Sequence, residues 1–291
     1  MRSRKLIKLL SPLRLILAAL TYSFGAGIAD YLGRPFLSAP FWLGMVAVLL
    51  AQLTMSLLPE IFRLDVEPLS ENETPAERYK LRYNILYVSL ASLASIVLIV
   101  YGLFTTKQLP PSSIFFLALT LLIIIAYAIP PLRFVNRGFG EILLAAQLAY
   151  VVPSLAFVLQ AGDLHRFLAL TIPLTLLAFS YFVALNFQSY QQDQKYGRVT
   201  FLVRLGWERV VPLHHLFLLT AYILLITAPA IGLSLSLIWS AFLTLPFALY
   251  QILQLRNISL GLPPNWTILH ATALAVFGLT TYFLAISFWI R

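Results

Sequence analysis

Nine long apolar runs, separated by short segments that carry Pro, Gly or charge, account for most of this 291-residue chain. A helix that spans a bilayer needs roughly 20 consecutive apolar residues. Windows of that length select residues 13–33, 38–59, 84–105, 112–131, 139–161, 167–187, 209–230, 234–254 and 267–289. Only a few residues around Gly232 separate the seventh and eighth runs, so eight spans is the alternative. The pattern predicts an all-α integral membrane protein, a bundle of about nine transmembrane helices in one polytopic domain over residues 1–291.

The composition supports a bilayer as the surrounding medium. Hydrophobic residues make up 60% of the chain and charged residues 11%, against about 25% charged in soluble proteins. The net charge of +9 does not indicate nucleic acid as a partner, because the basic residues lie in the short segments between apolar runs. Such residues anchor loops at an anionic membrane surface.

The distribution of Lys and Arg predicts the orientation. With the N-terminus and alternate loops on one side, that side receives sixteen of the 20 basic residues. Only Arg34, Lys107, Arg166 and Arg291 fall on the other side. The positive-inside rule therefore places the N-terminus in the cytoplasm and the C-terminus outside.

Several charged and small residues have structural explanations. Thr74-Pro75-Ala76-Glu77 reads as a capping box that starts the third helix. Asp30 lies four residues before Arg34, which favours an ion pair between them. Glu141, four residues after Arg137, suits the start of the fifth helix. Gly25, Gly27 and Ala29 favour close packing of the first helix.

Three polar segments on the predicted cytoplasmic side could carry chemistry, namely residues 60–82, 126–141 and 186–206. The first contains six of the eleven acidic residues. The chain has no cysteine, which excludes disulfides and thiolate chemistry, and its four histidines show no metal-ligand spacing.

The second and third segments resemble the UbiA-type prenyltransferases, especially the members of the menaquinone branch. The middle segment matches at Tyr127, Pro130, Pro131, Leu132, Arg133, Arg137, Gly138, Gly140 and Glu141. The third resembles the family's second aspartate motif at Asp193, Gly197, Thr200, Arg204, Leu205 and Gly206, with Asn186 upstream, and the first helix is similar at Tyr22, Gly25, Ala26, Gly27, Ala29 and Gly33.

The resemblance implies helices around a central cavity, and two aspartate-rich motifs that hold an isoprenyl diphosphate through Mg²⁺. The prenyl group then passes to an aromatic or other lipid-soluble acceptor. Mg²⁺ prefers carboxylate, water and phosphate oxygens, and two carboxylates at positions i and i+4 share one helix face. An apolar, aromatic-lined cavity would shield the allylic cation that forms.

The chain departs from this pattern at the metal motifs. Alignment on Glu60 places Pro59 at the usual asparagine, Arg63 at the central aspartate and Glu67 at the last acidic position. In the second motif Ser189 replaces the first aspartate, and Asp193 remains. The resemblance therefore leaves Asp193 and Glu67, with Glu60 third and Asp65 as an alternative, as predicted ligands of a weakened Mg²⁺ site.

The remaining predicted site residues would hold the substrate; no catalytic residue is assigned. Guanidinium groups present a fork that suits phosphate oxygens, which favours Arg63, Arg133, Arg137 and Arg198 as diphosphate ligands. Lys80 and Arg82 are further candidates. Tyr127, Asn186 and Tyr190 are predicted to line the pocket.

Two functions remain open. One is Mg²⁺-assisted prenyl transfer from a polyprenyl diphosphate to a hydrophobic acceptor. The other is a catalytically silent relative that binds an isoprenoid lipid or scaffolds a partner, with the basic residues serving as membrane anchors. Transport of a charged solute is disfavoured, because the apolar runs carry almost no ionisable groups near the membrane midplane.

Overall fold

The computed structural model describes residues 10–63, 67 and 74–290 of the chain, and every regular element in that part is a helix. Within these residues nine helices are long and apolar enough to cross a membrane, as predicted. The spans comprise α2 (Pro12–Tyr31), α3 (Ser38–Ile61), α4 (Pro75–Thr105), α5 (Pro111–Ala128), α6–α7 (Gly140–Ala161), η3–α8 (Arg166–Lys195), α10 (Trp207–Ile226), α11–α12 (Leu235–Ser259) and α13–α14 (Trp266–Trp289). The short helix α9 (Phe201–Leu205) lies outside them.

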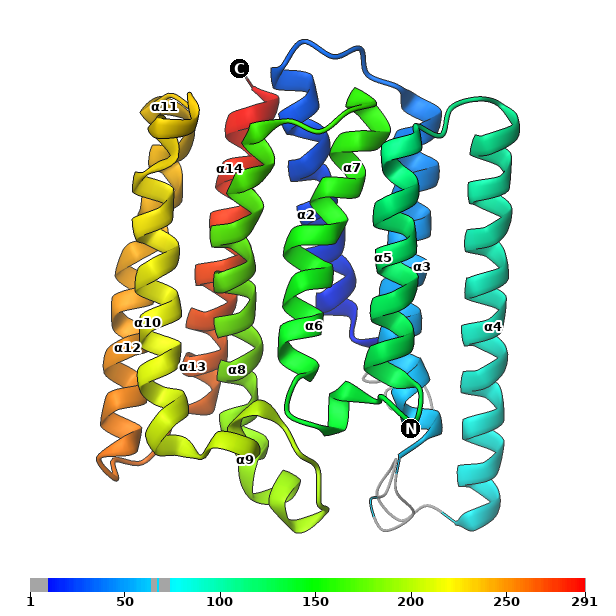
Figure 1. The fold of residues 1–291 in the computed structure, drawn as a ribbon. Helices are drawn as coiled ribbons and strands as arrows, with labels where there is room; N and C mark the ends of the chain where they lie inside the picture. Colours follow the sequence, from blue (N-terminus) through cyan, green and yellow to red (C-terminus); the bar gives the residue numbers. More distant parts are fainter. Residues whose placement is uncertain (1–9, 64–66, 68–73, 291) are drawn as a thin grey trace.

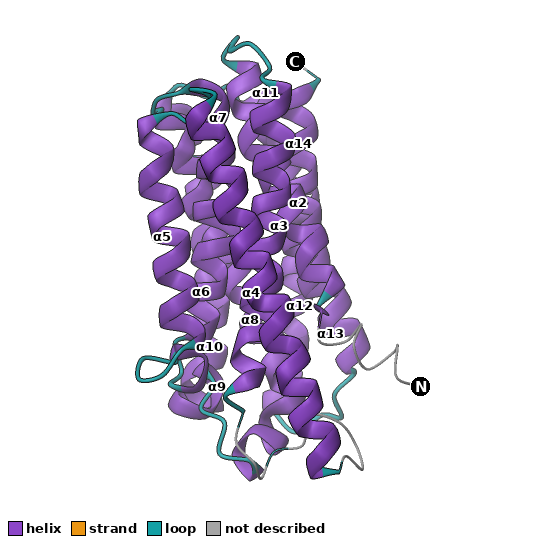
Figure 2. Ribbon diagram, turned by 90° about the vertical axis from the view of Figure 1, so that its right-hand side faces the viewer, coloured by secondary structure: helices purple, strands orange, loops and turns teal. Residues whose placement is uncertain are grey.

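The spans run side by side with short connections at both ends (Figures 1 and 2). α2 lies in the interior and packs on α3, α7 and α14, whereas α4 lies at one edge of the bundle and packs on α3 (Figure 1). α3 and α8 end, and α6 begins, at the same end of the bundle. We call it the polar end, because the three polar segments noted in the sequence meet there.

Small residues allow α2 to approach its neighbours closely. A Cβ atom added at Gly25 would lie 1.9 Å from the backbone oxygen of Pro153 in α7. One added at Gly27 would lie 2.9 Å from the indole nitrogen of Trp289, which donates a hydrogen bond to the Ser23 carbonyl. The predicted close packing of the first helix is confirmed, since lipid-embedded helices approach through such residues.

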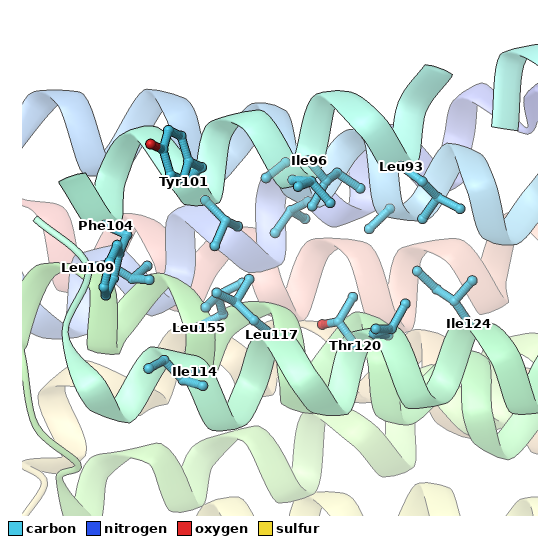
Figure 3. A pocket seen from close by; sticks show the side chains of 16 residues that line it. Leu93, Ile96, Tyr101, Phe104, Leu109, Ile114, Leu117, Thr120, Ile124 and Leu155 are labelled. Atoms are coloured by element: carbon cyan, nitrogen blue, oxygen red, sulfur yellow. The ribbon is translucent and has the colours of Figure 1, made fainter. Parts of the chain in front are cut away.

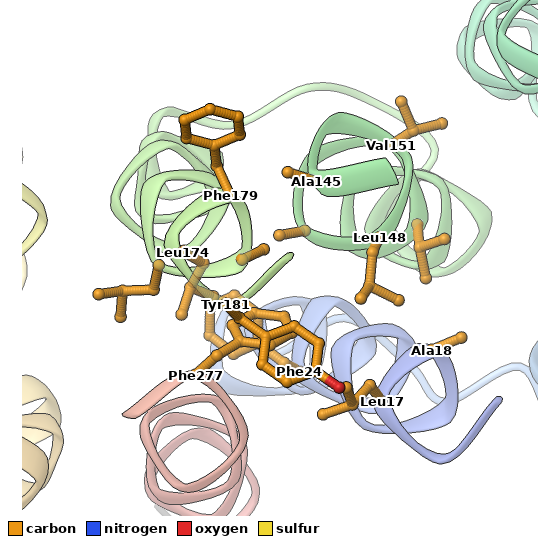
Figure 4. Close-up of a cluster of buried hydrophobic side chains, with 14 of the residues drawn as sticks. Leu17, Ala18, Phe24, Ala145, Leu148, Val151, Leu174, Phe179, Tyr181 and Phe277 are labelled. Atoms are coloured by element: carbon orange, nitrogen blue, oxygen red, sulfur yellow. The ribbon is translucent and has the colours of Figure 1, made fainter. Parts of the chain in front are cut away.

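Aromatic and aliphatic side chains fill the interior between α2, α8 and the last span. Phe24, Tyr181 and Phe277 converge there (Figure 4). Tyr181 and Phe277 have ring centroids 6.0 Å apart, and Phe24 packs edge-on against Phe288 at 5.8 Å.

An apolar groove of about 570 Å³ lies between α3, α4, α5 and α7 (Figure 3). Its walls include Val48 of α3, Ile96 of α4, Leu117 of α5 and Leu155 of α7. This groove lies toward the α4 edge of the bundle, so the central cavity implied by the resemblance stays a prediction.

The start of α4 confirms the predicted cap. The Thr74 hydroxyl accepts a hydrogen bond from the Glu77 backbone at 3.3 Å, and the Glu77 carboxylate accepts one from the Thr74 backbone at 3.3 Å. This capping box satisfies donors that would otherwise have no partner in the first turn.

The predicted pairing of Arg34 is wrong. Its guanidinium contacts Asp163, in the connection after α7, at 3.1 Å, instead of Asp30. α2 ends at Tyr31, and Gly33 has a φ of +72° that turns the chain. Asp30 and Arg34 therefore do not share a helix face, which the i, i+4 argument requires.

Candidate functional site

Charged side chains line a small pocket at the polar end of the bundle. Its walls are Pro59, Glu60, Arg63, Glu67, Arg133, Val135, Asn136 and Arg198, and we call it the polar-end pocket. They come from the end of α3, the residue at 67, the α5–α6 connection and the segment after α8. Segments far apart in sequence thus supply one concentrated set of charges.

The first wall forms around Arg63, just beyond the last turn of α3. The Arg63 guanidinium contacts Glu60 at 2.7 Å and Glu67 at 3.4 Å. Two arginines of α4 hold the same stretch by its backbone: Arg82 donates to the Arg63 carbonyl, and Arg78 donates to the Glu67 carbonyl at 2.8 Å. The first predicted metal segment is therefore fixed by arginines on two sides.

The second wall forms at the end of α8, around Asp193, which is only 2% exposed. One carboxylate oxygen accepts a hydrogen bond of 2.7 Å from Ser189, one helical turn earlier. The other lies 3.8 Å from Arg198, and the same Arg198 nitrogen lies 3.5 Å from Glu67. Glu67 and Asp193 thus share one guanidinium, which unites the two predicted metal segments in one site.

Hydrogen bonds join the two loops that carry Arg133 and Arg198. The Gly138 backbone donates to the Val199 carbonyl at 2.6 Å, and the Val199 backbone donates to the Asn136 side chain at 3.0 Å. Arg204 donates to the Arg137 carbonyl at 2.6 Å, with its guanidinium 4.3 Å from the centroid of the Phe139 ring. Residues 133–141 and 198–204 therefore form one hydrogen-bonded unit beside the pocket, which we call the platform.

Glu141 anchors this platform to the bundle. Its Oε1 atom accepts a hydrogen bond from the Asn186 side chain of α8 and one of 3.1 Å from the Phe201 backbone of α9. Glu141 is buried at the start of α6, as is Gly140 beside it. The contacts give Glu141 a structural role and place Asn186 on Glu141 instead of in the pocket.

Arg133 and Arg137 point to different places although they are four residues apart. Arg133 has a left-handed backbone, with a φ of +36°, and its side chain lines the pocket. Burial lowers its pKa, and the neighbouring charge of Arg198 lowers that pKa further. Arginine nevertheless stays protonated in proteins. Arg137 is exposed and donates to the Pro131 carbonyl at 2.7 Å.

Two predicted lining residues also have other neighbours. Tyr127 is buried at the end of α5, with its ring beside Gly140. Tyr190 packs edge-on against Trp207 at 5.9 Å and accepts a hydrogen bond of 2.9 Å from Gln194. Neither lines the polar-end pocket.

Sequence reasoning missed Asn136 and Arg78. Asn136 lines the pocket and accepts from the Val199 backbone, and Arg78 holds the Glu67 carbonyl. The signal for Asn136 was its place between two basic residues of the matching loop. Arg78 carried no such signal, because its position was explained by membrane anchoring alone.

The carboxylates do not form the donor set that Mg²⁺ requires. Within the described ranges, no group of three or more His, Cys, Asp or Glu residues could hold a metal ion. Glu60, Glu67 and Asp193 each contact a guanidinium, and Ser189 also donates to Asp193. Mg²⁺ needs several free oxygen ligands in an octahedron. Asp65 lies outside the described residues, and the magnesium site stays a prediction that these contacts do not favour.

Comparisons with known proteins agree with this fold. The model of the UbiA prenyltransferase family matches residues 72–261, well over half of the chain. A UbiA homolog from Archaeoglobus fulgidus bound to Cd²⁺ superimposes with a TM-score of 0.60 and 16% identity, covering 99% of this chain and 100% of the homolog. The apo structure of a UbiA homolog from Aeropyrum pernix K1 gives a TM-score of 0.56 and 14% identity, covering 93% and 96%. Curated proteins gave no match.

Proposed function

Because the chain belongs to the UbiA prenyltransferase family, we propose that it binds an isoprenyl diphosphate and transfers the prenyl group to a hydrophobic acceptor. The observation that carries this proposal is the convergence of Arg63, Arg133 and Arg198 on one pocket at the end of a membrane-spanning bundle. A phosphorylated lipid matches this arrangement, since its anionic head group suits the arginines and its apolar tail suits the bilayer.

Guanidinium chemistry suits the head group. Each arginine can donate two parallel N–H bonds to phosphate oxygens, and such charge-assisted bonds are about twice as strong as neutral ones. Glu60, Glu67 and Asp193 hold two of these arginines, Arg63 and Arg198, in place. The loops that carry Arg133 and Arg198 are joined by backbone hydrogen bonds, so little ordering is needed on binding.

The transfer would proceed by breaking the bond between the first prenyl carbon and the bridging diphosphate oxygen. The electron pair leaves with the diphosphate, whose charge the arginines stabilise. The acceptor supplies the electron pair for the new bond to that carbon and then loses a proton. This step involves no metal, because the described carboxylates do not fit one.

The competing function is a silent relative that binds an isoprenoid diphosphate without turnover. The replacement of two acidic motif positions by Arg63 and Ser189 favours it. Binding and release of diphosphate separate the two functions, so the site can be tested before any acceptor is known.

The test uses the full-length chain in detergent or nanodiscs, with geranylgeranyl diphosphate as the probe. Saturable binding with release of pyrophosphate in the presence of a set of quinone-type and phenolic acceptors supports the enzyme. Saturable binding without release supports the silent relative. Failure to bind any isoprenyl diphosphate would refute both functions.

The proposed orientation places the polar end in the cytoplasm, because most basic residues lie in the connections on that side. The chain has no cysteine, so single cysteines can report topology without background. In cells, Arg256→Cys should resist a membrane-impermeant maleimide, and Arg34→Cys should react. The reverse labelling pattern would contradict this orientation.

A further inference from the structure

We infer that the polar-end pocket binds its diphosphate with arginine guanidiniums in the place of divalent cations, so that binding does not require Mg²⁺. The inference rests on the proposed function and concerns the same site. Three observations carry it: the contacts of Arg63, the contacts of Arg198, and the balance of charge in the pocket.

Arg63 occupies the position between the acidic side chains of the first segment. Its Nε atom lies 2.7 Å from Glu60, and another guanidinium nitrogen lies 3.4 Å from Glu67. A cation bridging these carboxylates would have to displace that guanidinium. Arg63 is mostly buried and also held through its backbone by Arg82, so moving it away is costly.

Arg198 likewise lies between carboxylates, one from each of the two predicted metal segments. One of its nitrogens lies 3.5 Å from Glu67 and 3.8 Å from Asp193. The remaining Asp193 oxygen accepts from Ser189 at 2.7 Å. Among the described residues, the three predicted metal ligands Glu60, Glu67 and Asp193 therefore each contact a guanidinium of this chain.

The charges that line the pocket favour an anion. Its described walls carry three guanidiniums, Arg63, Arg133 and Arg198, and two carboxylates, Glu60 and Glu67, while Asp193 contacts Arg198 without lining the pocket. A bound diphosphate would exchange with the carboxylates for the same N–H groups. Because arginine cannot lose its proton, the positive charge is permanent and needs no ion from solution.

This exchange predicts opposite effects for the two partners of one ion pair. Arg198→Gln removes a phosphate donor and should weaken binding at least about tenfold, as expected for a charged hydrogen bond. Asp193→Asn removes a carboxylate that competes for Arg198 while keeping an oxygen for Ser189. It should tighten binding roughly two- to fivefold, the range of a partly exposed ion pair. A metal-dependent site predicts the reverse for Asp193.

The experiment measures the dissociation constant of geranylgeranyl diphosphate for the purified full-length protein, in excess EDTA and in millimolar Mg²⁺. We expect the two constants to agree within about threefold, and inorganic pyrophosphate to compete in both buffers if the head group supplies the affinity. Arg256→Gln removes a basic residue at the end of α12, away from the pocket, and is the matched control. It should bind as the parent protein does.

The outcomes separate the inference from the proposed function. Binding that appears only with Mg²⁺, or Asp193→Asn binding more weakly than the parent protein, overturns the inference and leaves the function intact. Absence of binding in both buffers overturns the proposed function itself. If Asp193→Asn does not elute as a monodisperse species, Glu67→Gln replaces it and should likewise tighten binding. The comparison of dissociation constants in EDTA and in Mg²⁺ tests the inference without either variant.

Discussion

The close contact between α2 and α7 gives a stability prediction for Gly25→Ala. The added Cβ atom would lie 1.9 Å from the Pro153 oxygen, and real Cβ atoms essentially never approach closer than 3.0 Å. The two helices must therefore separate by about 1.1 Å, the difference between those two distances. The obstacle is a backbone atom, which cannot rotate away as a side chain can.

Overpacking of this kind costs about 1–3 kcal/mol in unfolding free energy. Alanine also favours the helical backbone over glycine, by roughly 0.5–1 kcal/mol. Gly102→Ala in α4 isolates this second effect, because a Cβ atom at Gly102 meets nothing within 4 Å. The gain from alanine is common to both variants, so they should differ by the overpacking cost alone, about 1–3 kcal/mol, with Gly102→Ala the more stable.

The assay compares apparent melting temperatures in one detergent, read from the monodisperse peak after heating. A difference of this size corresponds to roughly 2–12 °C between the variants. Equal melting temperatures for Gly25→Ala and Gly102→Ala would refute the close contact and with it the packing of α2 on α7.

Three further predictions concern the platform and the ends of the bundle. Glu141→Ala leaves two partly buried donors, the Asn186 side chain and the Phe201 backbone, without an acceptor, so it should lower the unfolding free energy by about 2–4 kcal/mol and weaken diphosphate binding. Glu141→Gln keeps an acceptor and should bind the diphosphate more nearly as the parent protein does. Equal loss of binding in both variants would point to the charge of Glu141 instead. Gly138→Ala forces a side chain onto a φ of +76° and against Arg204, so it should lower affinity for the diphosphate without abolishing folding, as judged by elution and binding together. Arg34→Ala removes an exposed ion pair with Asp163 and should change the melting temperature by less than about 3 °C; a larger loss would mean the pair is more buried than its contacts indicate.

Hydrophobicity predicted the fold, because each membrane-spanning helix must by itself supply roughly 20 consecutive apolar residues. The exceptions occur where a helix continues beyond the apolar run. α4 begins at Pro75, before its apolar run starts at residue 84, as the capping box at Thr74 predicted. α8 continues to Lys195, because α-helical hydrogen bonds persist through polar residues. Apolar length marks the membrane-embedded part of a helix and not its ends.

The site was predictable as three segments but not as a set of side chains. Of the two arginines of the middle segment that were predicted to bind the diphosphate, only Arg133 lines the polar-end pocket. The backbone there forms a short turn with a left-handed residue, so the four-residue spacing to Arg137 does not place both on one face. Asn186 was expected to line the pocket because nothing in the sequence pairs it with Glu141, 45 positions earlier. Contacts of that kind follow from the packing of α6 on α8.

The departures from the family's acidic pattern are best understood as one coupled change. Glu60, Glu67 and Asp193 would repel one another at a poorly hydrated helix end unless a cation lay between them. Arg63 and Arg198 lie between them, and Ser189 donates a hydrogen bond where a further carboxylate would have added charge. The same guanidiniums therefore stabilise the neighbouring carboxylates and can donate hydrogen bonds to a phosphate. A ligand must then exchange for carboxylates that already hold the arginines, so its affinity depends on the strength of those ion pairs instead of the concentration of a metal.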